Sequence, residues 1–188
     1  VMKQAAIFIA PGFEEIEALT PADVLNRAGA EVELISITED KSVTGAHGLT
    51  IVCDRVFEGK PIGDKDIIIL PGGMPGAKNL QAHPKLGEML QDYNTRQKWI
   101  GAICAAPMIL GEMGLLEGRR ATCFTGFEEH LKGARHYPVP AITDGHIITG
   151  RGIGAAMEFS LEIVSNLYGP YTAAQLRERM VVPDIAEE

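Results

Sequence analysis

The chain alternates short apolar runs with longer segments that carry apolar residues at helical spacing. The apolar runs that stand out lie at residues 5–10, 67–70 and 99–103, and residues 32–37 are expected to form a further strand. Apolar runs without polar alternation are typical of strands buried on both faces, and strand–helix alternation favours a mostly parallel sheet. The pattern predicts an α/β fold, a doubly wound and mostly parallel sheet with helices on both faces.

The expected helix ends follow from capping residues. Thr20-Pro21 resembles an N-cap followed by proline at the first helical position, so we expect the helix over residues 14–28 to bend or restart there. Gly29 is placed to close that helix just beyond its C-cap. Thr172 is expected to cap a final helix that ends near Met180.

Two hairpins are expected in addition. Gly45 and Gly48 interrupt the chain before an apolar stretch over residues 49–53. Asp144-Gly145 is a typical turn dipeptide between the apolar stretches 141–143 and 146–149.

A short strand over residues 121–124 and a helix over residues 154–167 complete the expected elements. The sequence shows no linker, internal repeat or low-complexity segment. A length of 188 residues suits one domain better than two. We therefore expect a single domain over residues 1–188.

The charge and hydropathy of the chain exclude several classes of partner. The net charge is −8, and no stripe of Lys and Arg offsets the repulsion of a phosphate backbone. No segment reaches the roughly 18 apolar residues of a membrane-spanning helix, and the first apolar run lacks the features of a secretory signal. We expect a cytoplasmic protein with neither nucleic acid nor membrane as a partner.

The cysteines do not form a disulfide or zinc pattern. Cys53, Cys104 and Cys123 are odd in number and widely spaced, with no CxxC pair and no histidine at zinc-ligand spacing. They are expected to be free thiols in a reducing compartment, and no metal site is expected.

The unusual residues fall where the expected strands end. Pro11–Glu17, Gly72-Gly73, Cys104 and Arg151-Gly152 each follow an apolar run. Ligands bind at the carboxyl ends of parallel strands, so these segments are expected to share one crevice. Cys104 is the strongest candidate, because a thiol at the start of a helix is favoured as the reactive thiolate. The alternative is a small buried apolar side chain, which is the expectation for Cys53 and Cys123.

Carboxyl groups near this thiol must meet a physical condition. Glu14, Glu15 and Glu17 form an acidic first turn, which the helix dipole also favours without any function. An ionised carboxylate beside Cys104 would raise the pKa of the thiol, whereas a protonated one could donate a hydrogen bond to sulfur. The histidines divide into two groups: His47, His83 and His130 are expected at the surface, and His136 and His146 could approach the crevice.

Four motifs, in this order along the chain, resemble the ThiJ/PfpI superfamily. They are EEIE at 14–17, LPGGMPGA at 70–77, AICAAP at 102–107 and TGRG at 149–152. The similarity runs from Ala5 to about Val182 and is closest to the branch that contains the parkinsonism-associated deglycase and YajL.

The resemblance implies a flavodoxin-like fold, a homodimer and a cysteine site that needs no cofactor. It points to Cys104 as the nucleophile and to Glu17, rather than Glu14 or Glu15, as its protonated partner. The remaining site residues that it implies are Gly73 and Ala105 as backbone N–H donors, and Gly72, Arg27 and Arg151 near the pocket or the dimer interface.

Departures from related classes narrow the expected activity. Peptidase-like members carry a histidine immediately after the cysteine, where this chain has Ala105, and amidotransferases need a C-terminal His-x-Glu that is absent here. Some glyoxalase-active relatives have a histidine in the stretch that is Phe124–Phe127 in this chain. His47 stands where the human member carries an arginine.

Two functions of different classes follow from the resemblance. The first is a cysteine-dependent glyoxalase or deglycase that acts on methylglyoxal, or on its early thiol and amine adducts, and protects against carbonyl stress. The second is a redox-sensing protective chaperone in which Cys104 oxidises to the sulfinate. A purely structural dimeric domain is the remaining alternative.

Overall fold

The computed structural model describes residues 2–184 and is built on a seven-stranded sheet. The spatial order of its strands is β10 (Ala141–Asp144), β11 (Ile147–Gly150), β7 (Trp99–Ile103), β6 (Ile67–Leu70), β1 (Gln4–Ile9), β2 (Glu31–Ser36) and β5 (Arg55–Val56). Every neighbouring pair is parallel except the β10–β11 hairpin. The prediction of a doubly wound, mostly parallel sheet is confirmed.

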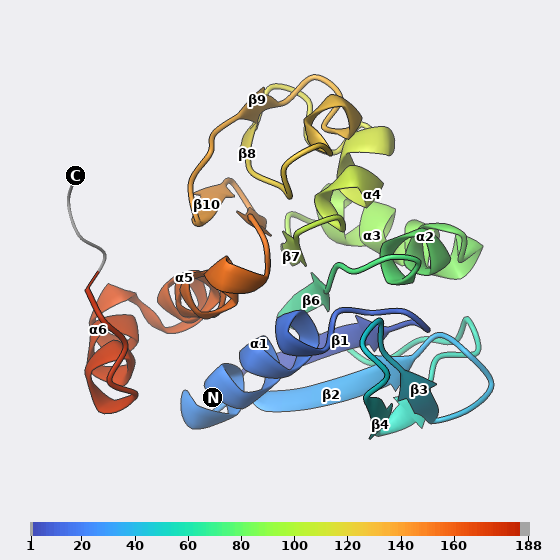
Figure 1. Ribbon diagram of the computed structural model, residues 1–188, viewed down its shortest axis with the longest axis horizontal. Coiled ribbons are helices and arrows are strands. Elements are labelled where there is room, and N and C mark those ends of the chain that lie inside the picture. The colour runs from blue at the N-terminus through green and yellow to red at the C-terminus, as the bar shows by residue number, and fades with distance from the viewer. Residues whose placement is uncertain (1, 185–188) are drawn as a thin grey trace.

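Helices cover both faces of this sheet (Figure 1). One face carries α1 (Glu15–Arg27), α5 (Ala156–Tyr168) and α6 (Pro170–Arg179), and the other carries α2 (Gly76–Gln81), α3 (Pro84–Thr95) and α4 (Pro107–Glu112). Alternate strand residues point to opposite faces, so that Ile7 and Ile69 pack with α1 and α5, while Phe8 and Ile68 pack with α3 and α4. The central strands are therefore buried on both sides, as their continuous apolar sequence requires.

Shorter elements lie outside the main sheet. They are the antiparallel pair β3 (Ser42–Thr44) and β4 (Thr50–Val52), the parallel pair β8 (Arg120–Ala121) and β9 (Arg135–His136), and the 3₁₀ helices η1 (Glu128–His130) and η2 (Ile153–Ala155). Both predicted hairpins are confirmed. The strand predicted over 121–124 is wrong, because pairing stops at Ala121 and the N–H of Phe124 turns to bond the carbonyl of Cys104 at 2.9 Å.

Two predicted helix starts are also wrong. Helix α1 does not restart at Pro21: it runs from Glu15 to Arg27, Glu14 caps it by accepting the N–H of Ile16, and Thr20 lies inside the helix. A bend at Pro21 stays a prediction. Thr172 likewise lies in the first turn of α6, which begins at Pro170 after Gly169. In α1 the cap is the earlier residue Glu14, and in α6 proline occupies the first helical position.

The close of α1 agrees with the sequence. Gly29 follows the C-cap residue Ala28 and has φ of +95°, a conformation that favours glycine. Within residues 2–184, no helix is both long enough and apolar enough to cross a membrane.

Candidate functional site

Cys104 occupies a strained turn at the carboxyl end of β7. Its φ is +66°, which is uncommon for a residue with a side chain and costs energy. Two backbone hydrogen bonds hold it there: its N–H donates to Gly150 at 2.9 Å, and its carbonyl accepts the N–H of Phe124 at 2.9 Å. The turn therefore fixes the thiol between the ends of neighbouring segments.

The Cys104 side chain opens into a small pocket of about 230 Å³. The residues that line it are Glu14, Glu17, Gly73, Met74, Cys104, Ala105, Phe124, Phe127 and Ile153. Cys53 and Cys123 are buried elsewhere, and burial raises their pKa values to about 11 and about 12. Among the three thiols, Cys104 alone is partly exposed and can meet a ligand.

Glu17 is completely buried beside Cys104. Its Oε1 accepts the N–H of Gly72 at 3.0 Å, and its Oε2 has no nitrogen or oxygen partner among residues 2–184. A Cβ on Gly72 would lie 2.7 Å from both the Cys104 Cβ and Glu17 Oε1. The two side chains therefore converge on this glycine, and a larger residue here would clash with both. Glu17 Oε2 is therefore a buried carboxyl oxygen whose hydrogen-bonding capacity is unused among residues 2–184.

Opposing influences set the protonation of this pair. Burial raises the pKa of Glu17 to about 7; the charge of Glu14 adds to that rise, while hydrogen bonds from Cys104 and Gly72 oppose it. Burial, and then the charge and hydrogen bond of Glu17, raise the pKa of Cys104, whereas the N–H groups of Ala105 and Gly73 lower it.

The start of helix α4 does not set the pKa of the Cys104 thiol, contrary to the expectation from the sequence. Helix α4 begins only at Pro107, and burial and Glu17 outweigh the N–H groups that favour the thiolate. Cys104 and Glu17 therefore titrate as a coupled pair, and the location of their proton decides which atom is reactive.

Two backbone donors face the sulfur. The N–H groups of Gly73 and Ala105 both lower the pKa of Cys104. Gly73 has φ of +88°, and a Cβ there would lie 2.5 Å from the backbone nitrogen of Glu14. Only glycine fits this position, which brings its N–H close to the thiol without a side chain in the way.

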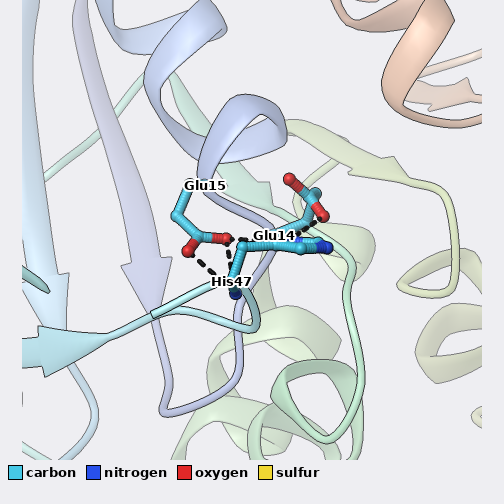
Figure 2. Close-up of side chains that lie close together, drawn as sticks. All are labelled: Glu14, Glu15 and His47. Atoms are coloured by element: carbon cyan, nitrogen blue, oxygen red, sulfur yellow. Dashed lines mark hydrogen bonds and ion pairs between the residues drawn. The ribbon is translucent and has the colours of Figure 1, made fainter. Parts of the chain in front are cut away.

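Glu14, which lines the pocket, also belongs to a second cluster of titratable groups with Glu15 and His47 (Figure 2). The Nδ1 of His47 is 3.1 Å from Glu14 Oε2 and 3.3 Å from Glu15 Oε1. Burial raises the pKa of Glu15, but hydrogen bonds from backbone N–H groups, those of Leu49 and His47 included, lower it overall. His47 was predicted to be a solvated loop residue; its ring is exposed, yet it is anchored to both carboxylates.

The donor atoms of Glu14, Glu15 and His47 lie within 4.8 Å of one another. Hydrogen bonds already explain their positions, since Glu14 caps α1 and Glu15 holds the loop that carries His47. The absence of a metal site therefore stays a prediction.

The other predicted residues lie outside the pocket. Arg27 pairs with Asp23 in the last turn of α1 and lines a separate groove along that helix. Arg151 lies in a groove next to the pocket. His136 belongs to β9 and does not line the pocket.

The prediction that His146 could approach the crevice is wrong. Its Nε2 lies 2.8 Å from Asn94 Oδ1, and its carbonyl accepts the N–H of Ile100 near the start of β7. It is therefore at the opposite end of the sheet from Cys104.

Sequence reasoning missed the apolar wall of the pocket. Phe124, Phe127 and Ile153 line it, and Phe124 and Ile153 are each 46% exposed. They lie in segments with no motif of their own, and they reach the pocket because the carbonyl of Cys104 holds the backbone of Phe124.

Comparisons with known proteins agree with this geometry. A family model described as "DJ-1/PfpI family" matches residues 3–166. The Parkinson disease protein 7 homolog of Danio rerio is 34% identical over 97% of this chain and 98% of its own length. The glutathione-independent glyoxalase DJR-1.2 of Caenorhabditis elegans is 36% identical over 89% of this chain and 90% of its own. The solved structure of oxidized Toxoplasma gondii DJ-1 superposes with a TM-score of 0.91 at 30% identity, covering 95% of this chain and 98% of that one.

Proposed function

Because the chain belongs to the DJ-1/PfpI family, we propose that its Cys104 pocket is the active site of a glyoxalase or deglycase. The substrate is methylglyoxal or one of its early thiol or amine adducts, and the product is lactate. The observation that carries the proposal is the completely buried carboxyl of Glu17, which converges with Cys104 at Gly72. The glyoxalase name of the nematode relative supports the choice of substrate.

The first step is addition of sulfur to the aldehyde carbon. Transfer of the shared proton from Sγ to Glu17 Oε2 gives a thiolate, which forms the carbon–sulfur bond while the carbonyl electron pair moves to oxygen. The N–H groups of Gly73 and Ala105 stabilise this oxyanion, and Glu17 then protonates it. The result is a hemithioacetal on Cys104 and an ionised Glu17. An early adduct joins the same path by exchanging its thiol or amine for Cys104.

The second step moves one hydrogen between adjacent carbons. Glu17 removes the proton from the former aldehyde carbon and returns it to the neighbouring ketone carbon, while the hydroxyl proton on the first carbon passes to the oxygen of the second. The first carbon thereby becomes the thioester carbonyl, and the second carries the hydroxyl of lactate. The product is a lactoyl thioester of Cys104. Water cleaves the thioester, lactate leaves and the thiol is restored. A carboxyl with a pKa of about 7 can both give and take a proton at neutral pH, which suits Glu17 to both roles.

Lactate formation tests this function. Wild-type protein should convert methylglyoxal to lactate without added glutathione or metal, and Cys104→Ser should lose at least about a hundredfold in kcat/KM. Cys53→Ala removes a thiol outside the pocket and serves as the matched control. Equal rates in wild type and Cys104→Ser would refute the proposal.

Redox sensing by the same thiol is the second candidate function. Cys104 is the partly exposed thiol, and a structural relative has been solved in an oxidized form. One molecule of peroxide converts the thiolate to the sulfenate, releasing water, and a second gives the sulfinate. Gain of two oxygen atoms at Cys104 under mild peroxide, with no lactate formed, would favour this role and a protective chaperone that binds partly unfolded proteins.

We also propose a homodimer, as the resemblance implies. A groove of about 600 Å³ runs along α1, and it is lined by Ile16, Leu19 and Leu49, which are 49%, 39% and 60% exposed. Exposed apolar side chains that gather in one place are typical of interfaces. Arg27 lies in the same groove, which would give it an interface role rather than a catalytic one.

A further inference from the structure

We propose that Arg151 binds an anionic group of the substrate, so that the Cys104 pocket prefers methylglyoxal adducts of thiols or amines that carry a carboxylate. This inference rests on the function proposed above and narrows its substrate class.

The groove of Arg151 adjoins the pocket of Cys104. It has a volume of about 390 Å³, and Phe124 and Ile153 line both spaces. Both spaces are also tied to the same turn, because Cys104 bonds Gly150, the residue before Arg151, on one side and Phe124 on the other. A ligand attached to the Cys104 sulfur can therefore extend along Phe124 and Ile153 into this groove.

Arg151 has unused hydrogen-bonding capacity there. Its Nη1 donates to the carbonyl of Pro138 at 3.3 Å, and within residues 2–184 no carboxylate lies within 4.0 Å of its guanidinium. A guanidinium carries five N–H donors in a planar fork that matches a carboxylate. The remaining donors are thus available to a ligand.

The acidic groups of this region have hydrogen-bond or ion-pair partners of their own, although the charge of Arg151 also lowers the pKa of Glu128 from beyond ion-pair distance. Glu158 lines the same groove but pairs with Arg177. Glu128 accepts the N–H of Gly126 at 2.7 Å. Arg151 therefore remains a positive charge in the groove without an ion-pair partner, and an anionic group entering it meets no free carboxylate that lines the groove.

Only a ligand longer than methylglyoxal can react at Cys104 and reach Arg151 at the same time. Methylglyoxal is small and uncharged, so it fills the Cys104 pocket without reaching the neighbouring groove. A hemithioacetal or carbinolamine formed with a small carboxylate-bearing thiol or amine places its reacting carbon at the sulfur and its charge several bonds away. Such adducts match two adjoining spaces that are both lined by Phe124 and Ile153.

Labelling of Cys104 tests the anion site without any turnover. The probes are maleimidoacetate, maleimidopropionate and maleimidohexanoate, each compared with its methyl ester, and the labelled Cys104 peptide is quantified by mass spectrometry. We expect at least one acid to react roughly tenfold faster than its ester, the preference that one charge-assisted hydrogen bond provides. Arg151→Gln should abolish this preference, and Arg135→Gln, which removes an exposed charge outside both spaces, should keep it. Equal rates for acids and esters in wild type, or a preference that survives Arg151→Gln, would overturn the proposal.

Turnover then separates the two proposals. With the adducts of N-acetylcysteine and of its amide, Arg151→Gln should lose the preference for the acid in kcat/KM, whereas Arg135→Gln should keep it. If no protein forms lactate, the proposed function fails, while the labelling ratios still decide whether Arg151 binds the anion.

Discussion

At the scale of single residues, burial of one carboxyl governs the chemistry. Glu17 is completely inaccessible and binds its proton up to about pH 7. Burial and the charge of Glu17 raise the pKa of Cys104, so neither group titrates as it would in water. The N–H of Gly72 favours the charge on Glu17, and those of Gly73 and Ala105 favour it on sulfur. The reactive form is the one in which sulfur holds the charge.

Substitutions of Glu17 test the shared proton. Glu17→Gln keeps an N–H donor beside the sulfur without a charge, whereas Glu17→Asp is shorter and still repels the thiolate when ionised. We expect Gln to preserve more thiolate character than Asp, although both lose the proton transfer and fall at least about a hundredfold in kcat. Ultraviolet absorbance of the thiolate against pH measures the first effect, and reversed or equal thiolate fractions would count against the shared proton.

Burial of Glu17 also predicts how stability depends on pH. The unfolded chain releases this proton near the ordinary value of 4.5, and the folded chain holds it to about 7. Between these values the folded state binds the extra proton, so the free energy of unfolding falls as pH rises, by up to about 1.4 kcal/mol per pH unit.

Urea denaturation at pH 5 and pH 7 measures this slope. Glu17→Gln should remove most of the difference that the wild type shows, because the amide does not titrate. An unchanged difference would mean that other groups set the slope.

At the scale of elements, the turn after β6 holds the site together. Because Gly72 has no Cβ, Cys104 and Glu17 can approach each other, and the N–H of Gly73 lowers the pKa of the thiol. Gly72→Ala would place a methyl group 2.7 Å from Cys104 Cβ, Glu17 Oε1 and the carbonyl of Ile103. We expect a loss of about 1–3 kcal/mol in the free energy of unfolding and loss of activity.

Gly87→Ala is the matched control for this substitution. Gly87 lies inside α3, where a Cβ would meet nothing within 4 Å, so alanine should stabilise the protein by about 0.5–1 kcal/mol and leave activity intact. Thermal melts and lactate assays on both variants provide the readout. A Gly72→Ala protein with normal activity would show that close approach of Cys104 and Glu17 is not required for activity.

At the scale of the whole molecule, the groove along α1 is the proposed surface for a second copy. Leu19→Lys places a charge in the middle of its apolar lining and should convert a dimer to a monomer with unchanged circular dichroism. Tyr171→Lys, an exposed substitution on α6 outside this groove, should leave the dimer intact. Sedimentation equilibrium decides, and a wild-type monomer or a Leu19→Lys dimer would contradict the proposed interface.

Much of the fold and of the site can be predicted from the sequence, and the features that cannot be predicted have physical causes. Continuous apolar runs require burial on both faces, which gives the sheet, and motifs at strand ends place Cys104 near Glu17 and Gly73. The bond between His47 and Glu14 joins distant loops, so no local pattern reveals it. The cap at Thr20 was misread because Glu14 already caps the helix.

The pH dependence of Cys104 alkylation in the wild-type protein is the most direct test of the proposed chemistry. If proton transfer to Glu17 generates the thiolate, the rate of alkylation should rise with an inflection near 7, where the pair loses its first proton. A single inflection at or above the ordinary thiol value of about 9 would show that the first charge resides on the carboxylate, and that the thiol is unreactive at neutral pH.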